Sequence, residues 1–120
     1  MPDDAQRPML AHNVYFALKD NSAASIAAMV ADCRRYLSDH PGTVLFAAGT
    51  LSDLSRDVND RRFDVALHVV FEDRASHDAY QKAAAHLEFI QRNKENWKQV
   101  RVFDSDVSGA GNCQPRHIPS

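Results

Sequence analysis

Cysteine, glycine and long apolar runs are all scarce in this 120-residue chain. Its two cysteines, Cys33 and Cys113, have no CxxC spacing and cannot form a disulfide framework. We expect Cys33 to be buried within a helix and Cys113 to lie in a polar tail. The four glycines form no glycine-rich phosphate loop, which argues against a nucleotide site. No run approaches the roughly 18 consecutive apolar residues of a membrane span, and no secretory signal is expected behind the acidic start.

Strong net charge is also lacking. The formal net charge of −2 gives no long-range attraction for nucleic acid or for an acidic membrane surface. We therefore predict neither partner. The lack of a disulfide framework fits a reducing compartment, and we predict a cytoplasmic protein. The length fits one domain, and we place its bounds at residues 9–106. Residues 1–8 are predicted to be a flexible arm and residues 107–120 a disordered tail rich in glycine and proline.

What the chain does contain is a regular alternation of strand and helix patterns. Strands are predicted at residues 9–18, 43–51, 63–71 and 97–104, where β-branched and aromatic side chains gather. An amphipathic helix follows the capping residues 19–22 and ends near His40, before Pro41-Gly42. A second helix is predicted over residues 75–92. The order βαββαβ predicts an α+β, ferredoxin-like fold with a four-stranded antiparallel sheet and two helices on one face.

The strands predict a partner as well as a fold. In residues 9–18 both alternating sets of side chains are largely apolar, although two helices can cover only one face of the sheet. An uncovered apolar face of that size would be unusual on a monomer. The sequence therefore predicts a homodimer in which two sheets face each other.

Several short motifs resemble the stress-responsive α/β-barrel (Dabb) domain family over Leu10–Asp106. They are His12, Pro41-Gly42, Phe71-Glu72-Asp73, Ala79-Tyr80 followed by His86, and Val102-Phe103-Asp104. The resemblance implies a dimeric α+β barrel. Most members of the family have no assigned reaction. One plant branch, typified by olivetolic acid cyclase, closes linear polyketides by aldol condensation without a cofactor.

Carried onto this chain, that branch implies three catalytic residues. His86 would act as general base, Tyr80 would bind the carbonyl, and Asp104 would orient His86. The chain departs from the family pattern at Ala83-Ala84, where members commonly have His-Pro. On an unbroken helix Tyr80 and His86 lie about 120° apart, so they share a cavity only if the helix bends. Because alanines favour a straight helix, a cavity shared by Tyr80 and His86 is less strongly predicted here than in members with the proline.

The remaining candidates are ligand-binding side chains in a pocket between the second helix and the sheet. We expect Phe16, Leu87 and Phe89 to line it, with His12 and His68 as polar groups on neighbouring strands. His40 and His77 are predicted to be solvent-exposed, and His117 lies in the tail. We predict no metal and no cofactor, because the histidines show no metal-ligand spacing. Each candidate also has a purely structural interpretation, as a buried ring or a satisfied histidine.

Three functions remain open from the sequence. The first is a dimeric module that binds a small apolar or aromatic molecule or serves as an assembly unit. The second is a cofactor-free cyclase or aldolase-like enzyme with His86 as base. The third, by analogy of fold alone, is a small cofactor-free monooxygenase-type barrel. The first leads because no feature of the sequence demands chemistry.

Overall fold

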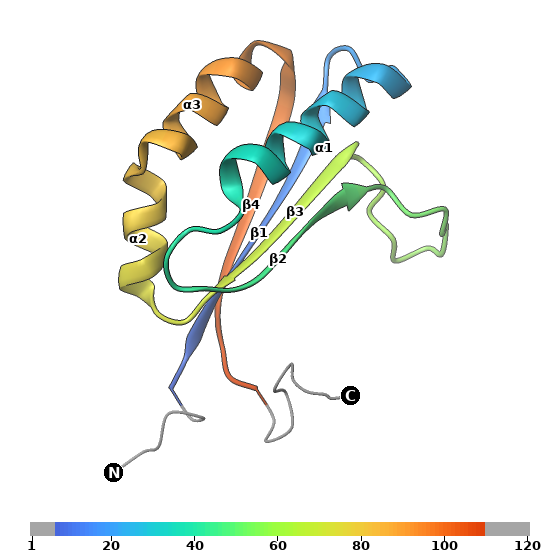
Figure 1. The fold of residues 1–120 in the computed structure, drawn as a ribbon. Coiled ribbons are helices and arrows are strands. Elements are labelled where there is room, and N and C mark those ends of the chain that lie inside the picture. Colours follow the sequence, from blue (N-terminus) through green and yellow to red (C-terminus); the bar gives the residue numbers. More distant parts are fainter. Residues whose placement is uncertain (1–6, 110–120) are drawn as a thin grey trace, which may run out of the picture.

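The computed structural model describes residues 7–109, which form a four-stranded sheet and three α-helices (Figure 1). In chain order the elements are β1 (Met9–Leu18), α1 (Ala23–Leu37), β2 (Thr43–Thr50), β3 (Val65–Phe71), α2 (Arg74–Lys82), α3 (Ala84–Asn93), a 3-10 turn (Lys94–Asn96) and β4 (Trp97–Val107). Most of the predicted arm and tail, with Cys113 and His117, lies outside the described residues. No helix between residues 7 and 109 is long and apolar enough to cross a membrane.

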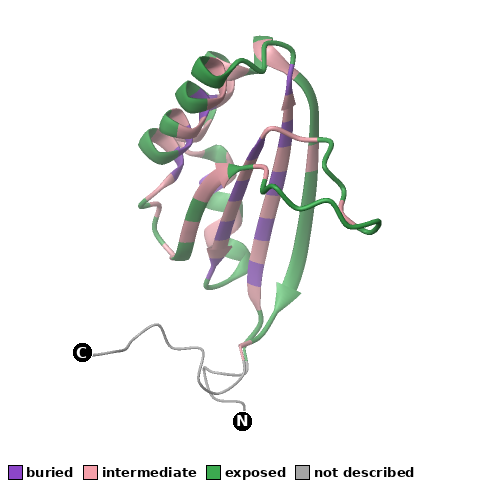
Figure 2. Cartoon of the chain, turned by 90° about the vertical axis from the view of Figure 1, so that its right-hand side faces the viewer, coloured by how far each residue is buried: buried purple, intermediate pink, exposed green. Residues whose placement is uncertain are grey.

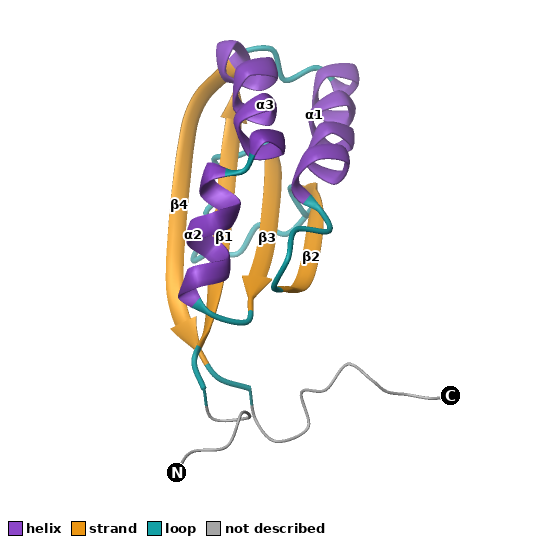
Figure 3. Ribbon diagram, turned by 60° about the vertical axis from the view of Figure 1, so that its left-hand side comes forward, coloured by secondary structure: helices purple, strands orange, loops and turns teal. Residues whose placement is uncertain are grey.

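The sheet is antiparallel with the strand order β2-β3-β1-β4. β1 therefore lies between β3 and β4, and Val14 pairs with both Leu67 and Val102. All three helices cover the same face of the sheet (Figure 3). This arrangement confirms the predicted α+β, ferredoxin-like fold, with β4 extending three residues beyond its predicted end.

The core lies between the helices and one face of the two central strands. Along β1 every second side chain is buried, beginning with Leu10, and β3 alternates in the same way from Val65 (Figure 2). This period of two places alternate side chains under the helix layer. α1 adds Met29, Cys33 and Leu37 to the same core. Cys33 is fully buried, as the sequence predicted.

α1 begins at the predicted caps and ends at Leu37, three residues before the predicted end near His40. The Ser22 side chain accepts a hydrogen bond from the Ser25 amide, which satisfies one of the free donors of the first turn. After Leu37 the chain turns through Asp39, at φ 63°, and Gly42, at φ 83°. Gly42 tolerates this left-handed backbone because it has no Cβ. The turn feeds β2 directly into the sheet.

The second helical pattern is not one helix, which corrects the prediction over residues 75–92. α2 ends at Lys82 and α3 starts at Ala84, because Ala83 adopts an extended conformation with ψ 145°. The Ala83 amide still bonds to the Tyr80 carbonyl, and the Ala83 carbonyl accepts from the Leu87 amide. Alanine is the best helix former, so local propensity does not explain this break. α2 lies on β1 and β3 whereas α3 packs mainly on α1, so the break lets the two segments follow different surfaces.

The opposite side of the sheet carries no helix. The open face, as we name it, comprises the residues that the register directs away from the helices: Met9, Ala11, Asn13, Tyr15 and Ala17 of β1; Leu45, Ala47 and Gly49 of β2; Ala66, His68 and Val70 of β3; Gln99, Arg101, Phe103, Ser105 and Val107 of β4. Most of these side chains are apolar. Leu45 is 50% exposed and Phe103 is 51% exposed. The open face is therefore a broad apolar surface, as the sequence predicted.

Two glycines provide a matched test of the turn before β2. A Cβ at Gly42 would lie 2.1 Å from Ser76 Oγ and 2.4 Å from Ser76 Cβ, in addition to the left-handed φ. At Gly49 a Cβ would meet nothing within 4 Å. We expect Gly42→Ala to lower the free energy of unfolding by about 2 kcal/mol or more. Gly49→Ala should change it by less than about 1 kcal/mol. Equal values from urea unfolding of the two variants would contradict this account.

Candidate functional site

A small pocket lies between the broken helix layer and the sheet. Its volume is about 160 Å³. The lining comes from six elements of the fold: His12, Val14 and Phe16 of β1; Leu37 of α1; Leu67 of β3; Tyr80 and Gln81 of α2; His86, Phe89 and Ile90 of α3; Trp97, Val100 and Val102 of β4. The walls are mainly aliphatic and aromatic, with a few polar atoms. Such a composition is typical of a site for a small organic molecule.

The break at Ala83 brings Tyr80 and His86 into this one pocket. Their ring centroids are 4.7 Å apart in an edge-to-face arrangement. This differs from the separation of about 120° that an unbroken helix would impose. Tyr80 and His86, the predicted carbonyl-binding residue and base, are therefore neighbours even though this chain lacks the proline of the family pattern.

Three polar atoms of the pocket residues are buried without a hydrogen-bond partner in the described structure. They are the Tyr80 hydroxyl, His86 Nδ1 and Trp97 Nε1. A buried polar group that makes no hydrogen bond costs roughly 1–3 kcal/mol, so native proteins rarely keep several together. All three atoms belong to residues that line the pocket.

Tyr80 is the centre of a cluster of rings. It is 2% exposed and contacts Phe71, His40 and His12 at centroid distances of 4.9, 5.0 and 5.9 Å. Burial raises the pKa of its hydroxyl, because the charged phenolate is poorly solvated there. The Tyr80 hydroxyl therefore stays protonated and acts as a hydrogen-bond donor. His40 contributes to this cluster, although the sequence predicted it to be solvent-exposed.

His86 is held neutral. Burial, and then the neighbouring His12, His40 and His77, lower its pKa to about 4. The sequence predicted that Asp104 would orient His86 and support its basicity. That prediction is wrong about the partner, since Asp104 bonds to His12 instead. Without a carboxylate beside it, His86 is a neutral but weak base.

His12 and Asp104 form the shortest polar pair of the site, with His12 Nδ1 and Asp104 Oδ1 2.6 Å apart. The register explains the pair, because the two residues are directly opposite in β1 and β4. His77 completes the group, with its ring centroid 5.1 Å from that of His12. It was predicted to be solvent-exposed, yet its side chain is only 13% exposed. The three residues can each direct one ligand atom to a common region, within 4.8 Å of one another.

Two predicted pocket residues lie elsewhere. His68 pairs with Asn13 across β3 and β1, so it belongs to the open face, whereas His12 lies on the helix side of the sheet. Its Nε2 atom lies 3.3 Å from the Tyr15 hydroxyl. Leu87 is 51% exposed on the outer surface of α3. Phe16 and Phe89 do line the pocket, where the sequence placed them.

The sequence missed the residues that the register and the helix break bring in. Trp97, Val100 and Val102 belong to β4 and point toward the helices, opposite the open face. Ile90 and Gln81 come from the two sides of the break. A signal for Trp97 existed, because the chain contains one tryptophan and it begins a strand.

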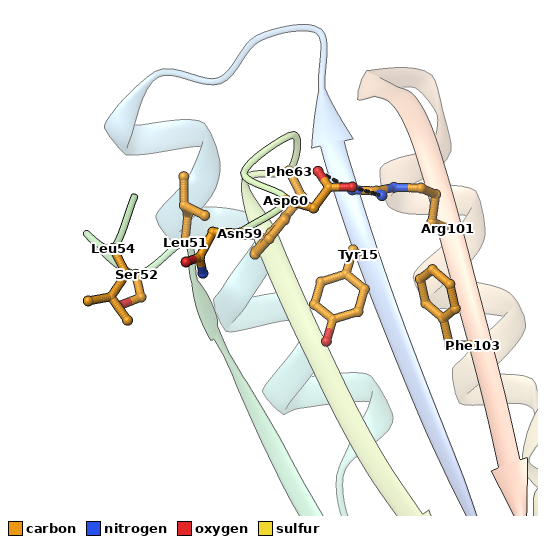
Figure 4. A pocket seen from close by; sticks show the side chains of 9 residues that line it. All are labelled: Tyr15, Leu51, Ser52, Leu54, Asn59, Asp60, Phe63, Arg101 and Phe103. Atoms are coloured by element: carbon orange, nitrogen blue, oxygen red, sulfur yellow. Dashed lines mark hydrogen bonds and ion pairs between the residues drawn. The ribbon is translucent and has the colours of Figure 1, made fainter. Parts of the chain in front are cut away.

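A wider hollow of about 330 Å³ lies on the open face, under the segment that joins β2 to β3 (Figure 4). Tyr15 packs there against Phe63 and Phe103, at 4.9 and 6.0 Å between centroids. Arg101 Nη1 bonds to Asp60 Oδ2 at 2.7 Å and lowers, after Arg62, the pKa of that carboxyl. The hollow contains none of the unpaired atoms described above, so we place the candidate site on the helix side.

The antiparallel sheet has the strand order β2-β3-β1-β4, and helices cover one of its faces. These features place the protein in the class with an α+β, ferredoxin-like fold. The family model of the stress responsive A/B barrel domain, Dabb, matches residues 10–107. The chain therefore belongs to this family, as the motifs indicated. A comparison with curated proteins found no match.

Solved structures show the same fold. A Dabb family protein from Mesorhizobium loti is 21% identical, with a TM-score of 0.70 over 86% of this chain and 100% of that chain. A dimeric ferredoxin-like protein of unknown function from Thermobifida fusca is 14% identical, with a TM-score of 0.70 over 85% and 93%. Hydroxynitrile lyase from Passiflora edulis is 22% identical, with a TM-score of 0.68 over 85% and 95%.

The neutral state of His86 makes stability depend on pH. Folding lowers its pKa below the value of about 6.5 in the unfolded chain, so protonation favours unfolding. This contribution is complete above pH of about 6.5 and is lost as the pH falls toward 4. We expect it to amount to about 1–2 kcal/mol after allowance for partial exposure.

Urea unfolding at pH 7 and pH 4.5, at one protein concentration, checks this expectation. The wild-type protein should lose more free energy of unfolding between the two pH values than His86→Gln, which keeps a polar side chain but cannot titrate. Identical losses in both proteins would contradict it.

Proposed function

We propose that the protein is a homodimeric α+β barrel that binds a small apolar or aromatic molecule carrying a carbonyl or similar oxygen. One observation carries this proposal: the Tyr80 hydroxyl, His86 Nδ1 and Trp97 Nε1 are all buried at one apolar pocket without partners. The O–H of Tyr80 and the indole N–H of Trp97 are donors, so the complementary group is an acceptor. The apolar walls fit the rest of the molecule.

The size of the pocket limits the ligand. A cavity of about 150 Å³ can hold benzene, and this pocket is of similar volume. Drug-sized ligands occupy roughly 300–1,000 Å³. A single ring with a short polar substituent, or a short-chain carbonyl compound, therefore fits the site.

A second candidate function is a cofactor-free reaction of the cyclase or lyase type, with His86 as base and Tyr80 as carbonyl donor. The observation in its favour is the 4.7 Å contact between these two rings. In such a step His86 would take a proton from the carbon next to the carbonyl, while the Tyr80 hydroxyl stabilises the enolate oxygen. Binding remains our first choice because a pKa of about 4 makes His86 a weak base. The hydroxynitrile lyase with the same fold shows only that this fold can host a lyase.

Acetophenone and ethylbenzene are matched probes, because they share a ring and differ by a carbonyl in place of a methylene. We expect saturable acetophenone binding that shifts the indole N–H resonance in ¹⁵N NMR, a signal assigned without ambiguity to the only tryptophan. Tyr80→Phe should weaken acetophenone roughly 2–10-fold, the worth of one hydrogen bond, and leave ethylbenzene unchanged. Tyr15→Phe on the open face is the control.

If acetophenone leaves the Trp97 resonance unmoved, or if Tyr80→Phe weakens both probes equally, the binding proposal fails. The same samples in deuterium oxide separate the two functions. Catalysis predicts that the methyl protons of acetophenone exchange faster with wild-type protein than with His86→Gln. Binding alone predicts no such acceleration.

The dimer is the second part of the proposal. The open face is apolar, and the Thermobifida fusca protein of the same fold is described as dimeric. Two open faces brought together as in a two-sheet barrel would remove Leu45, Phe103 and Val107 from water. The hollow beside Tyr15 would then lie at the interface.

Two leucines of equal exposure test the interface. Leu45 on the open face is 50% exposed, and Leu87 on the outer surface of α3 is 51% exposed. We expect Leu45→Lys to raise the dimer dissociation constant at least about tenfold, because a charge would be buried between the sheets. Leu87→Lys should leave it unchanged. Sedimentation equilibrium measures both, and a monomeric wild-type protein at micromolar concentration would refute the assembly.

A further inference from the structure

We infer that His12, His77 and Asp104 form a binding site for a divalent transition metal ion such as Zn²⁺. One ligand atom from each residue lies within 4.8 Å of the others. Bonds of about 2.0–2.2 Å to zinc would hold the three atoms roughly 3–4 Å apart. Small rotations of side chains on three separate elements are therefore enough to close the site.

The chemistry of the three donors selects the metal. Two imidazoles and one carboxylate suit zinc, iron and their neighbours in the first transition row, whereas magnesium and calcium prefer oxygen ligands alone. Three protein ligands leave a coordination position open for water or another small molecule. The donor set therefore resembles that of an open site and not that of a closed structural one.

A second observation supports the site independently. The Nδ1 atom of His77 lies 3.1 Å from the carboxylate of Asp78. A carboxylate on one imidazole nitrogen fixes the tautomer and leaves the lone pair on the other nitrogen, which is the usual arrangement around metal-bound histidine. Gln81 lies 3.5 Å from His77 Nε2 and is the only group that the described residues place against that lone pair.

The surroundings would admit an ion. The His12 side chain is 6% exposed and that of Asp104 is 42% exposed, so the group has one buried end and one end in solvent. The rings of His12 and His77 meet edge to face with centroids 5.1 Å apart, so one ion can reach both imidazoles. A cation there would take one ligand atom from each histidine and one from Asp104.

This inference goes beyond the proposed function. His12 also lines the organic pocket, but His77 and Asp104 do not. A metal held here would lie at one side of the pocket, next to the ring of Tyr80. Metal binding and acetophenone binding can therefore succeed or fail separately.

Calorimetric titration of the chelator-treated, full-length protein with ZnCl₂ tests the site. We expect one saturable zinc ion per chain and, with Co²⁺, visible d–d bands that report nitrogen and oxygen ligation. Asp78→Asn should weaken zinc about 10–100-fold, as losses of such supporting carboxylates do. His77→Gln and Asp104→Asn should weaken it at least as much.

Two control variants identify binding elsewhere. His68→Gln removes a histidine from the open face, and Cys113→Ser removes the thiol that lies outside the described residues. Both should leave zinc affinity unchanged. Absence of saturable binding, survival of binding in both His77→Gln and Asp104→Asn, or its loss in Cys113→Ser would each overturn the inference. Acetophenone binding is also measured for metal-free His77→Gln. If this variant binds acetophenone, a negative zinc result contradicts only the metal site and not the organic pocket.

Discussion

β1 is apolar on both of its sides, and this property governs how the sheet is covered. Its even-numbered side chains, from Leu10 to Leu18, are buried under the helices, whereas its odd-numbered ones face the uncovered side of the sheet. One strand therefore supplies both the floor of the pocket and the centre of the open face. The hydrophobic effect drives both surfaces out of water, but a single chain has helices for only one. This shortage is why we propose a ligand pocket on one side of the sheet and a dimer interface on the other.

The helix break at Ala83 decides what the pocket contains. α2 carries Tyr80 over the central strands, and α3 turns away to pack against α1. At the corner between them, His86 comes against Tyr80 and their polar atoms lose access to solvent. A straight helix would satisfy the local preference of the alanines but would point these rings in different directions. Tertiary packing overrides a weak local propensity here.

Electrostatics divides the histidines into two roles. His86 has no acidic partner in the described structure, so burial dominates and its pKa falls to about 4. His12 shares a short contact with Asp104, and His77 shares one with Asp78. The first arrangement suits a neutral group that pairs with an organic ligand. The second resembles histidines oriented for a cation, and the two lie side by side around Tyr80.

Residue patterns along the chain were enough to predict the order of elements, the ferredoxin-like fold, the apolar open face and the family. These properties depend on periodicity and on short motifs, which are local or repeat along the chain. The partners of the site residues, in contrast, depend on how distant segments pack together. Asp104 bonds to His12 and not to His86 because register sets which residues of β1 and β4 are opposite, and a shift of one residue would reverse the faces. Strand pairing also places His68 on the open face, and helix packing places His77 beside His12. No single segment encodes the pairing of strands or the break at Ala83.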